Sequence, residues 1–271
     1  MRRRTVLHGG AIALGSALAV RTARASATSA VAAAFEPLGS LELDGLSEVV
    51  VGSSGTVVFG AFRDGFVVVD VSDPASPAEL ARVTDVLSDA EAGPLEDIYE
   101  VSVSGDRLLV AGPHIGSGPD TTTGFEVYDV ADPASPARLA GTETDHAIHN
   151  GFLDGQTVYL TGTGASTSPL VVYDVGGDEP TEIARWSVED ADPAWGSVSR
   201  HFRQCHDVFV QDGVAAVAYW DAGTWLLDVS DPASPAVLGN LGGVPPDTLP
   251  ANTDSAFPPG ARELPGNSHY A

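Results

Sequence analysis

Four short runs of this sequence are rich in apolar and β-branched residues and end in an Asp-Val pair. They are GFVVVDV (65–71), GFEVYDV (124–130), PLVVYDV (169–175) and GTWLLDV (223–229). A Pro-containing turn and a shorter strand-like piece follow each run: AELARV, ARLAGT, TEIARW and AVLGNL. Two further β-rich runs around a Gly turn precede each one. The hydrophobic pattern therefore predicts a unit of four β-strands that occurs four times.

The turn after the third predicted strand is almost the same nine residues in three of the four units. DVSDPASPA starts at Asp70 and again at Asp228, and DVADPASPA starts at Asp129. Asp side chains in such a turn accept hydrogen bonds from nearby backbone amides, and the two prolines disfavour a helix. Pro77 then opens the fourth strand, where a residue without an N–H fits only at a sheet edge. The string therefore predicts a hairpin connection onto an outer strand.

The spacing of the units indicates the fold. The repeated Asp residues are 59, 45 and 54 residues apart, which is typical of the four-stranded blades of a β-propeller. We predict an all-β protein with a propeller domain at 35–271 and blades at about 47–83, 99–142, 149–186 and 206–241. Residues 35–43 resemble an outer strand without a blade before it, and 242–271 a long loop with the start of a further blade. These loose ends predict an incomplete ring.

The segments VVVDVSDP and VVYDV resemble the LVIVD-repeat family of secreted bacterial and archaeal proteins. The resemblance covers about residues 35–241. It implies a β-propeller fold, and it assigns neither catalytic residues nor a cofactor.

The N-terminus has the pattern of an export signal. Arg3 and Arg4 precede a short apolar run, and Ala23-Arg24-Ala25 supplies the small residues that a signal peptidase requires. This resembles a twin-arginine signal, so we expect 1–25 to be removed and 26–34 to be a linker. Because the apolar run is too short and glycine-rich for a stable membrane span, we expect a secreted protein, extracellular or at the cell surface, without membrane insertion after cleavage.

The chain is strongly acidic. Its 271 residues include 37 acidic residues and 13 arginines but no lysine, and the formal net charge is -24. Such a charge repels nucleic acid and anionic membranes, which excludes both as expected partners. Acidity spread along a chain without lysine resembles proteins of salt-loving archaea, in which salt screens the self-repulsion. The single cysteine, Cys205, leaves no internal disulfide to stabilise the fold.

Three histidines occupy matching places at the start of predicted first strands: His149 in IHN, His206 in CHD and His269 in SHY. Tyr99 and Ser47 take this place in the other two units. First strands border the central channel of a propeller, so we expect the imidazoles to meet at its mouth. A His set of this kind suits Zn, Cu or Fe.

Other side chains have supporting roles in this metal hypothesis. Cys205 or Asp207 would add a ligand, and Asp97, Glu100 or Asp145 would orient the imidazole rings. His114, in the loop after the second strand of its unit, lies on the same face but outside the expected ligand set. The alternative is structural: the histidines hydrogen-bond neighbouring blades as part of the fold.

Two functions remain open from the sequence. The first is a binding or interaction scaffold at the cell surface, whose loops bind a protein, a glycan or a small-molecule ligand. The second is a metal-dependent propeller enzyme, a hydrolase or oxidoreductase, that uses the three histidines. Arg200 and Arg203 suit either an anionic ligand or the protein's own carboxylates, and the acidic segment 84–97 suggests a solvated loop rather than a Ca²⁺ site.

Overall fold

The computed structural model describes residues 36–114, 120–164, 166–251 and 268–271. Contacts between residues divide the chain into two compact units, Met1–Ser40 and Leu41–Ala271. The second unit holds all of the described strands. The predicted export signal and the predicted linker lie outside the described residues. None of the described helices is long and apolar enough to cross a membrane.

The second unit contains four antiparallel sheets of four strands each. The first two sheets are β1 (Leu46–Val51), β2 (Val57–Phe62), β3 (Gly65–Asp70), β4 (Ala78–Thr84), and β5 (Glu100–Ser104), β6 (Arg107–Gly112), β7 (Gly124–Asp129), β8 (Ala137–Glu143). The other two are β9 (Ala147–Asp154), β10 (Thr157–Thr163), β11 (Leu170–Asp174), β12 (Thr181–Trp186), and β13 (Cys205–Gln211), β14 (Val214–Tyr219), β15 (Gly223–Asp228), β16 (Ala236–Leu241). Short helical turns are α2 (Val188–Ala191), η1 (Pro193–Ser197), η2 (Arg200–Phe202) and η3 (Pro246–Thr248).

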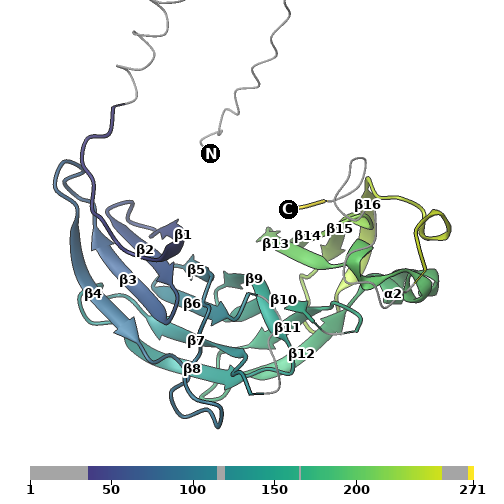
Figure 1. Cartoon of the computed structure of the whole chain (residues 1–271), viewed down its shortest axis with the longest axis horizontal. Coiled ribbons are helices and arrows are strands. Elements are labelled where there is room, and N and C mark those ends of the chain that lie inside the picture. Colours follow the sequence, from purple (N-terminus) through teal and green to yellow (C-terminus); the bar gives the residue numbers. More distant parts are fainter. Residues whose placement is uncertain (1–35, 115–119, 165, 252–267) are drawn as a thin grey trace, which may run out of the picture. The chain divides into compact units, whose positions relative to one another are not determined.

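The four sheets stand side by side as the blades of a propeller, and we number them blades 1 to 4 in chain order. Within each blade the strands pair in sequence order. Figure 1 shows the first strands, β1, β5, β9 and β13, on the concave side of the fan and the fourth strands on its outer side. The described blades do not close a ring. The predicted β-propeller fold is therefore confirmed, and so is the open ring.

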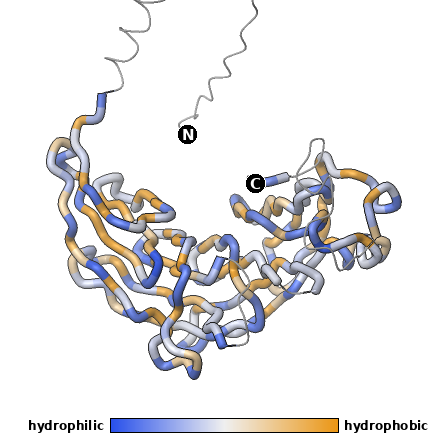
Figure 2. The backbone as a smooth tube through the Cα atoms, viewed as in Figure 1, coloured by the Kyte–Doolittle hydropathy of each residue, from blue (hydrophilic) through white to orange (hydrophobic). Residues whose placement is uncertain are grey.

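Hydrophobic side chains fill the space between neighbouring blades. Successive residues of a strand point to opposite faces, so a continuous apolar run such as β3 supplies both faces of its blade. Phe66 and Val68 pack with Leu108 and Val110 of blade 2. Equivalent clusters join blade 2 to blade 3 and blade 3 to blade 4. Figure 2 shows hydrophobic segments along the strands of every blade, as this packing requires.

The repeated Asp-rich turn has the hydrogen bonds that its sequence predicts. Asp70 Oδ1 accepts from the backbone N–H of Ser72 at 2.8 Å, and Asp73 Oδ1 accepts from that of Ala75 at 3.0 Å. The same two bonds recur at the turns that follow Asp129 and Asp228. The turn of blade 3, whose sequence differs from the other three, has only the first of these bonds, from the backbone N–H of Gly176 to Asp174 Oδ1. Each turn leads onto the outer strand of its blade, as expected.

Every blade carries a β-bulge between its third and fourth strands. In blade 1, Val68 pairs with Ala81 while Val69 pairs with Glu79, so the intervening Leu80 opposes no residue. The matching residues of the other blades are Leu139, Ile183 and Leu238. A bulge increases the local twist and bends its strand. The aliphatic third residue of AELARV, ARLAGT, TEIARW and AVLGNL is therefore the bulge residue of each outer strand.

Three segments differ from the sequence-based expectation. The described part of 35–43 forms no strand, because Pro37 and Gly39 interrupt it, although Leu43 packs beside the apolar cluster of blade 1. Among the described residues 268–271, no strand is formed, and Ser268 makes an isolated bridge with Trp220. The acidic segment 84–97 is not simply solvated. Its apolar residues are buried with the core shared by blades 1 and 2: Val86, Leu87 and Leu95.

Candidate functional site

A pocket of about 330 Å³ lies where the first strands of the blades begin. We call it the inner pocket. Its described lining consists of five consecutive residue pairs and one further residue: Ser47–Glu48, Tyr99–Glu100, His149–Asn150, His206–Asp207, His269–Tyr270 and His114. The first member of each pair is the position at which the sequence predicts a shared site. The fold therefore brings five equivalent positions together.

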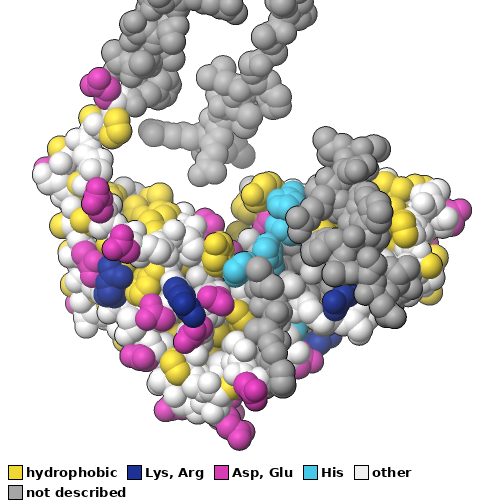
Figure 3. Space-filling view, in the orientation of Figure 1, with side chains coloured by type: hydrophobic (Ala, Val, Ile, Leu, Met, Phe, Trp, Pro, Cys, Tyr) yellow, Lys and Arg dark blue, Asp and Glu magenta, His cyan; other side chains and the backbone are white. Residues whose placement is uncertain are grey.

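Aromatic rings follow one another along this pocket. The ring centres of His149 and His206 are 4.2 Å apart, and those of His206 and His269 are 3.9 Å apart. At one end His149 neighbours His114, which stacks on Tyr99, and at the other end His269 neighbours Tyr270. We call these six side chains the ring row. Figure 3 shows histidine side chains gathered on the concave side of the blades.

Backbone contacts hold the C-terminal part of the ring row in place. The N–H of Ser268 donates to the carbonyl oxygen of Trp220 at 2.7 Å, and that of Ala271 donates to Asp207 Oδ2 at 2.9 Å. His269 lies between these two anchors and is thereby placed beside His206. Trp220 follows β14 with a φ of 28°, a backbone conformation that is rare for a bulky side chain. Strained residues of this kind cluster at functional sites.

Two imidazoles of the inner pocket, those of His149 and His206, are held in the neutral form. Burial lowers the pKa of His206 to about 3, and the neighbouring His149 and His269 add to the effect. Burial is also the largest cause of the lowered pKa of His149. His149 Nδ1 donates to the carbonyl oxygen of His114 at 3.0 Å, which places its proton on Nδ1. At neutral pH the rings of His149 and His206 therefore present dipoles and π-faces rather than positive charge.

The carboxylates of the pocket come from the second member of each pair. Glu48, Glu100 and Asp207 line the pocket, and no Arg or Lys is among its described lining residues. Burial raises the pKa of Glu100 well above its usual range, and the charges of Glu48 and Asp207 raise it further. Asn150 Nδ2 donates to Glu100 Oε2 at 3.2 Å. This amide is a weak substitute for a positive charge.

The structure separates the residues that the metal hypothesis grouped. His149, His206, His269 and Asp207 line the inner pocket, and Glu100 lies beside them. Cys205 faces the core between blades 3 and 4, where burial raises the pKa of its thiol. An inert buried thiol of this kind acts as a small apolar side chain.

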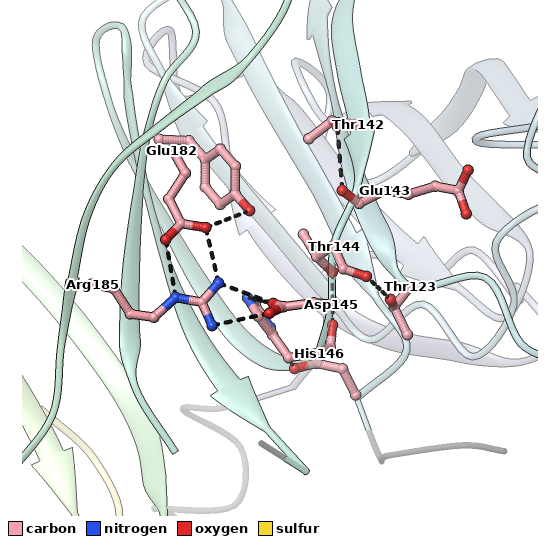
Figure 4. Close-up of polar contacts among 10 residues, drawn as sticks. Thr123, Thr142, Glu143, Thr144, Asp145, His146, Glu182 and Arg185 are labelled. Atoms are coloured by element: carbon pink, nitrogen blue, oxygen red, sulfur yellow. Dashed lines mark hydrogen bonds and ion pairs between the residues drawn. The ribbon is translucent and has the colours of Figure 1, made fainter. Parts of the chain in front are cut away.

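Asp145 lies elsewhere. Its carboxylate binds the guanidinium of Arg185 at 2.9 Å, and Glu182 holds the other side of the same guanidinium (Figure 4). His146 Nε2 is 3.9 Å from Asp145, and its ring is buried away from the inner pocket. Asp97 likewise pairs with Arg63, at 3.6 Å. Neither carboxylate therefore orients an imidazole of the ring row.

Metal binding by this set is not supported by the side-chain arrangement alone. Within the described ranges, no group of three or more His, Cys, Asp or Glu side chains is arranged to hold a metal ion. The histidine rings lie close in edge-to-face and tilted arrangements. Closeness of ring centres does not by itself give coordination, which requires the nitrogen lone pairs to converge on one point. Metal binding stays a prediction.

Sequence reasoning missed His114 as part of the site. It lies after β6, yet its ring centre is 3.9 Å from that of Tyr99 and 6.0 Å from that of His149. Trp220 directly follows β14 and stacks on His269. The available signal was the recurrence of an aromatic residue within two residues of the end of a second strand in two blades.

Arg203 does not reach the inner pocket. It is buried and forms an ion pair with Glu189 at 2.6 Å, and its Nε donates to the carbonyl oxygen of Val198. The protein's own carboxylate, rather than an anionic ligand, therefore neutralises this guanidinium.

Comparison with protein families matches two segments of the chain, residues 53–85 and 203–241, to the LVIVD repeat. The match supports the LVIVD repeat family. The first matched segment contains β2 to β4 and the second contains the whole of blade 4. No curated protein matched the sequence.

Solved structures with the same fold are distant in sequence. The β-propeller domain of Cps50 (Swd1) from Myceliophteria thermophila has a TM-score of 0.55 at 10% identity, over 77% of this chain and 59% of that one. A functionally unknown protein from Desulfotomaculum acetoxidans has a TM-score of 0.56 at 8% identity, over 75% and 58%. BamB from Moraxella catarrhalis has a TM-score of 0.52 at 12% identity, over 77% of this chain and 53% of that one. The chain spans just over half the length of these structures, and the likeness concerns the fold alone.

Proposed function

We propose that this LVIVD-repeat propeller is a ligand-binding protein, and that its ligand occupies the inner pocket. The observation that carries the proposal is the convergence of five equivalent residue pairs, from four blades and the C-terminal segment, around one pocket. A volume of about 330 Å³ lies within the range of small-molecule sites. Purely structural residues would pair with one another, whereas Glu100 lacks a cationic partner among the described residues.

A screen for ligand-induced stabilisation tests this proposal. The full chain is melted alone and with neutral sugars, organic anions and organic cations, each in excess. A ligand at a hundred times its Kd stabilises the folded state by about 2.7 kcal/mol. We expect stabilisation by at least one class, and its loss in His206→Ala. If no class raises the melting temperature of the wild-type protein, the proposal is wrong.

The proposed place of action is outside the cell or at its surface. The support is the sequence pattern of Arg3 and Arg4, the short apolar run and the Ala-x-Ala site at Ala23–Ala25. We expect the exported protein to begin at Ser26, and expect Arg3→Lys with Arg4→Lys to block export. N-terminal sequencing of secreted material checks the cleavage site. A secreted protein that still starts at Met1 would contradict this proposal.

A metal-dependent propeller enzyme is the second candidate. The observation in its favour is that His149, His206 and His269 lie next to one another, as a channel-mouth ligand set requires. Elemental analysis of the purified full chain tests it directly. Stoichiometric Zn, Cu or Fe that is lost in His149→Ala would favour the enzyme, and a metal-free protein that still binds an organic ligand would favour the binding protein.

A further inference from the structure

We propose that the ligand of the inner pocket is a small organic cation, a molecule that presents an ammonium group to the ring row and the carboxylates. This inference rests on the proposed ligand-binding function and specifies its ligand class. Two independent features of the pocket carry it, the unneutralised carboxylates and the row of aromatic faces.

The carboxylates of the pocket have no Arg or Lys partner among its described lining residues. Glu100 is 9% exposed, and its described hydrogen bond comes from the uncharged amide of Asn150. Removing a carboxylate from water without a counter-charge is costly. Glu48 and Asp207 lie at the same pocket and increase its negative potential. Burial therefore favours the protonated form of Glu100, and an ammonium group in the pocket would favour the ionised form and supply the missing counter-charge.

The ring row supplies aromatic faces over which an ammonium group can bind. Ammonium groups bind over the faces of aromatic rings, and several rings around one cation form an aromatic cage. Tyr99 and Tyr270 line the pocket at either end of the row, and both are largely exposed, at 48% and 81%. Their exposure is unusual for aromatic residues and leaves ring surface available to a ligand. Between them, burial lowers the pKa of His149 and of His206, so these two rings add no positive charge at neutral pH that would repel a cation.

Other ligand classes fit the pocket less well. An anion would meet Glu48, Glu100 and Asp207 without a described Arg or Lys to bind it. A neutral sugar would leave Glu100 without a counter-charge. A metal ion would need converging donors, and the described residues provide no such group of three. An ammonium group needs no such converging donors. Carboxylates at several places around it and the faces of aromatic rings are enough to bind it, and this pocket has both.

A matched pair of probes separates charge from shape. Choline carries a quaternary ammonium, and 3,3-dimethylbutan-1-ol is its neutral carbon isostere. Both are titrated into the full chain by calorimetry, in a constant molar KCl background, with butylammonium as a primary-ammonium probe and Zn²⁺ as a metal probe. Salt weakens exposed charge pairs far more than partly buried ones, so binding in the inner pocket persists under these conditions.

We expect at least one ammonium probe to bind, and the neutral isostere to bind at least tenfold more weakly than choline. Glu100→Gln should weaken ammonium binding at least tenfold, because it removes the buried charge and keeps the side-chain shape. Glu143→Gln is the matched control, since Glu143 ends β8 outside the inner pocket, and it should bind as the wild type does. Melting curves verify that both variants fold.

Several results would overturn the inference. Equal affinity for choline and its isostere would show that charge is not recognised. Binding of Zn²⁺ but of neither ammonium probe would favour the metal alternative. Stabilisation by a sugar or an organic anion alone would refute the cation and leave the ligand-binding function standing, whereas stabilisation by no ligand class would refute both.

Discussion

His149 Nδ1 lies 3.0 Å from the carbonyl oxygen of His114 and donates a hydrogen bond to it. The bond links the first strand of blade 3 to the loop after β6 in blade 2. It also fixes the side chain's chemistry, because a proton on Nδ1 leaves Nε2 as the acceptor of the neutral ring. One inter-blade contact thus orients a pocket side chain and sets its tautomer.

The tautomer of His149 is open to direct measurement. At pH 7 we expect its imidazole to be neutral with the proton on Nδ1, since burial lowers its pKa and the His114 carbonyl holds that proton. Long-range nitrogen–proton NMR spectra of labelled protein distinguish the two tautomers and the charged ring. His149→Ala assigns the signal. A proton mainly on Nε2 would contradict the hydrogen bond.

Replacing Glu100 by glutamine should stabilise the unliganded protein at high pH. The pKa of Glu100 is raised by burial and by neighbouring carboxylates, so its proton is held to higher pH in the folded than in the unfolded state. The contribution of Glu100 to the free energy of unfolding is therefore fully present below its unfolded pKa of about 4.3. It decreases as pH rises from that value through the raised folded pKa. Urea unfolding at pH 4 and pH 8 should show a gain for Glu100→Gln that is larger at pH 8.

That prediction has a clear failing outcome. A Glu100→Gln variant that is less stable than wild type at pH 8 would show that the carboxylate has a favourable partner in the folded protein. Glu143→Gln serves as the control for an acidic residue outside the inner pocket, and it should show no such pH-dependent gain.

His206 should make the protein sensitive to acid. Its folded pKa is lowered to about 3, whereas the unfolded value is about 6.5. The stability that it contributes is fully present above the unfolded pKa and is lost as pH falls toward about 3. His206→Asn should flatten the decline of the melting temperature over this window relative to wild type. Parallel curves for the two proteins would disprove the lowered pKa.

The ion pair of Arg203 and Glu189 should be important for stability. Arg203 is buried and lies 2.6 Å from Glu189, so Glu189→Gln leaves a buried guanidinium without its counter-charge. We expect a loss of about 3 kcal/mol in the free energy of unfolding. Glu79→Gln removes a partner from the exposed Arg82 pair and should change stability by less than about 1 kcal/mol. Denaturant unfolding of both variants makes the comparison, and equal losses would contradict it.

Salt should stabilise the fold. The formal net charge of the whole chain is -24, and self-repulsion destabilises a compact state unless salt screens it. The melting temperature should rise between 0.1 M and 2 M KCl. Sucrose of the same osmolarity is the control, because it strengthens burial without screening charge, and it should stabilise less than KCl. A melting temperature independent of KCl would refute the prediction.

Much of the fold was predictable because the repeat carries its own local rules. The Asp and Pro positions of the turn at Asp70 predict its hydrogen bonds and the outer place of β4, and both are confirmed. The bulge at Leu80 was not predicted, because an extra residue in one strand is visible only when its register with the partner is known. The outer strand expected at 35–43 was wrong for a similar reason, since a strand-like composition does not supply a strand for the segment to pair with.

The candidate site was predictable only in part. Equivalent positions in the repeat led to His149 and His206, which the fold brings together. Asp145, expected among the carboxylates that orient the imidazole rings, is instead paired with Arg185. His114 was assigned to the same face but not to the site, because its closeness to His149 depends on how one blade's loop meets the next blade's first strand.

The Asp-rich turn has a consequence for how such a chain grows. Both of its capping hydrogen bonds join residues two apart in the sequence, so a gene duplication that copies one blade also copies everything that caps its turn. Strand residues pack against a different adjacent blade in each copy, so they must change to pack well there. The turns at Asp70 and Asp228 do not have to fit a neighbouring blade, and their nine residues are identical although the strands around them differ.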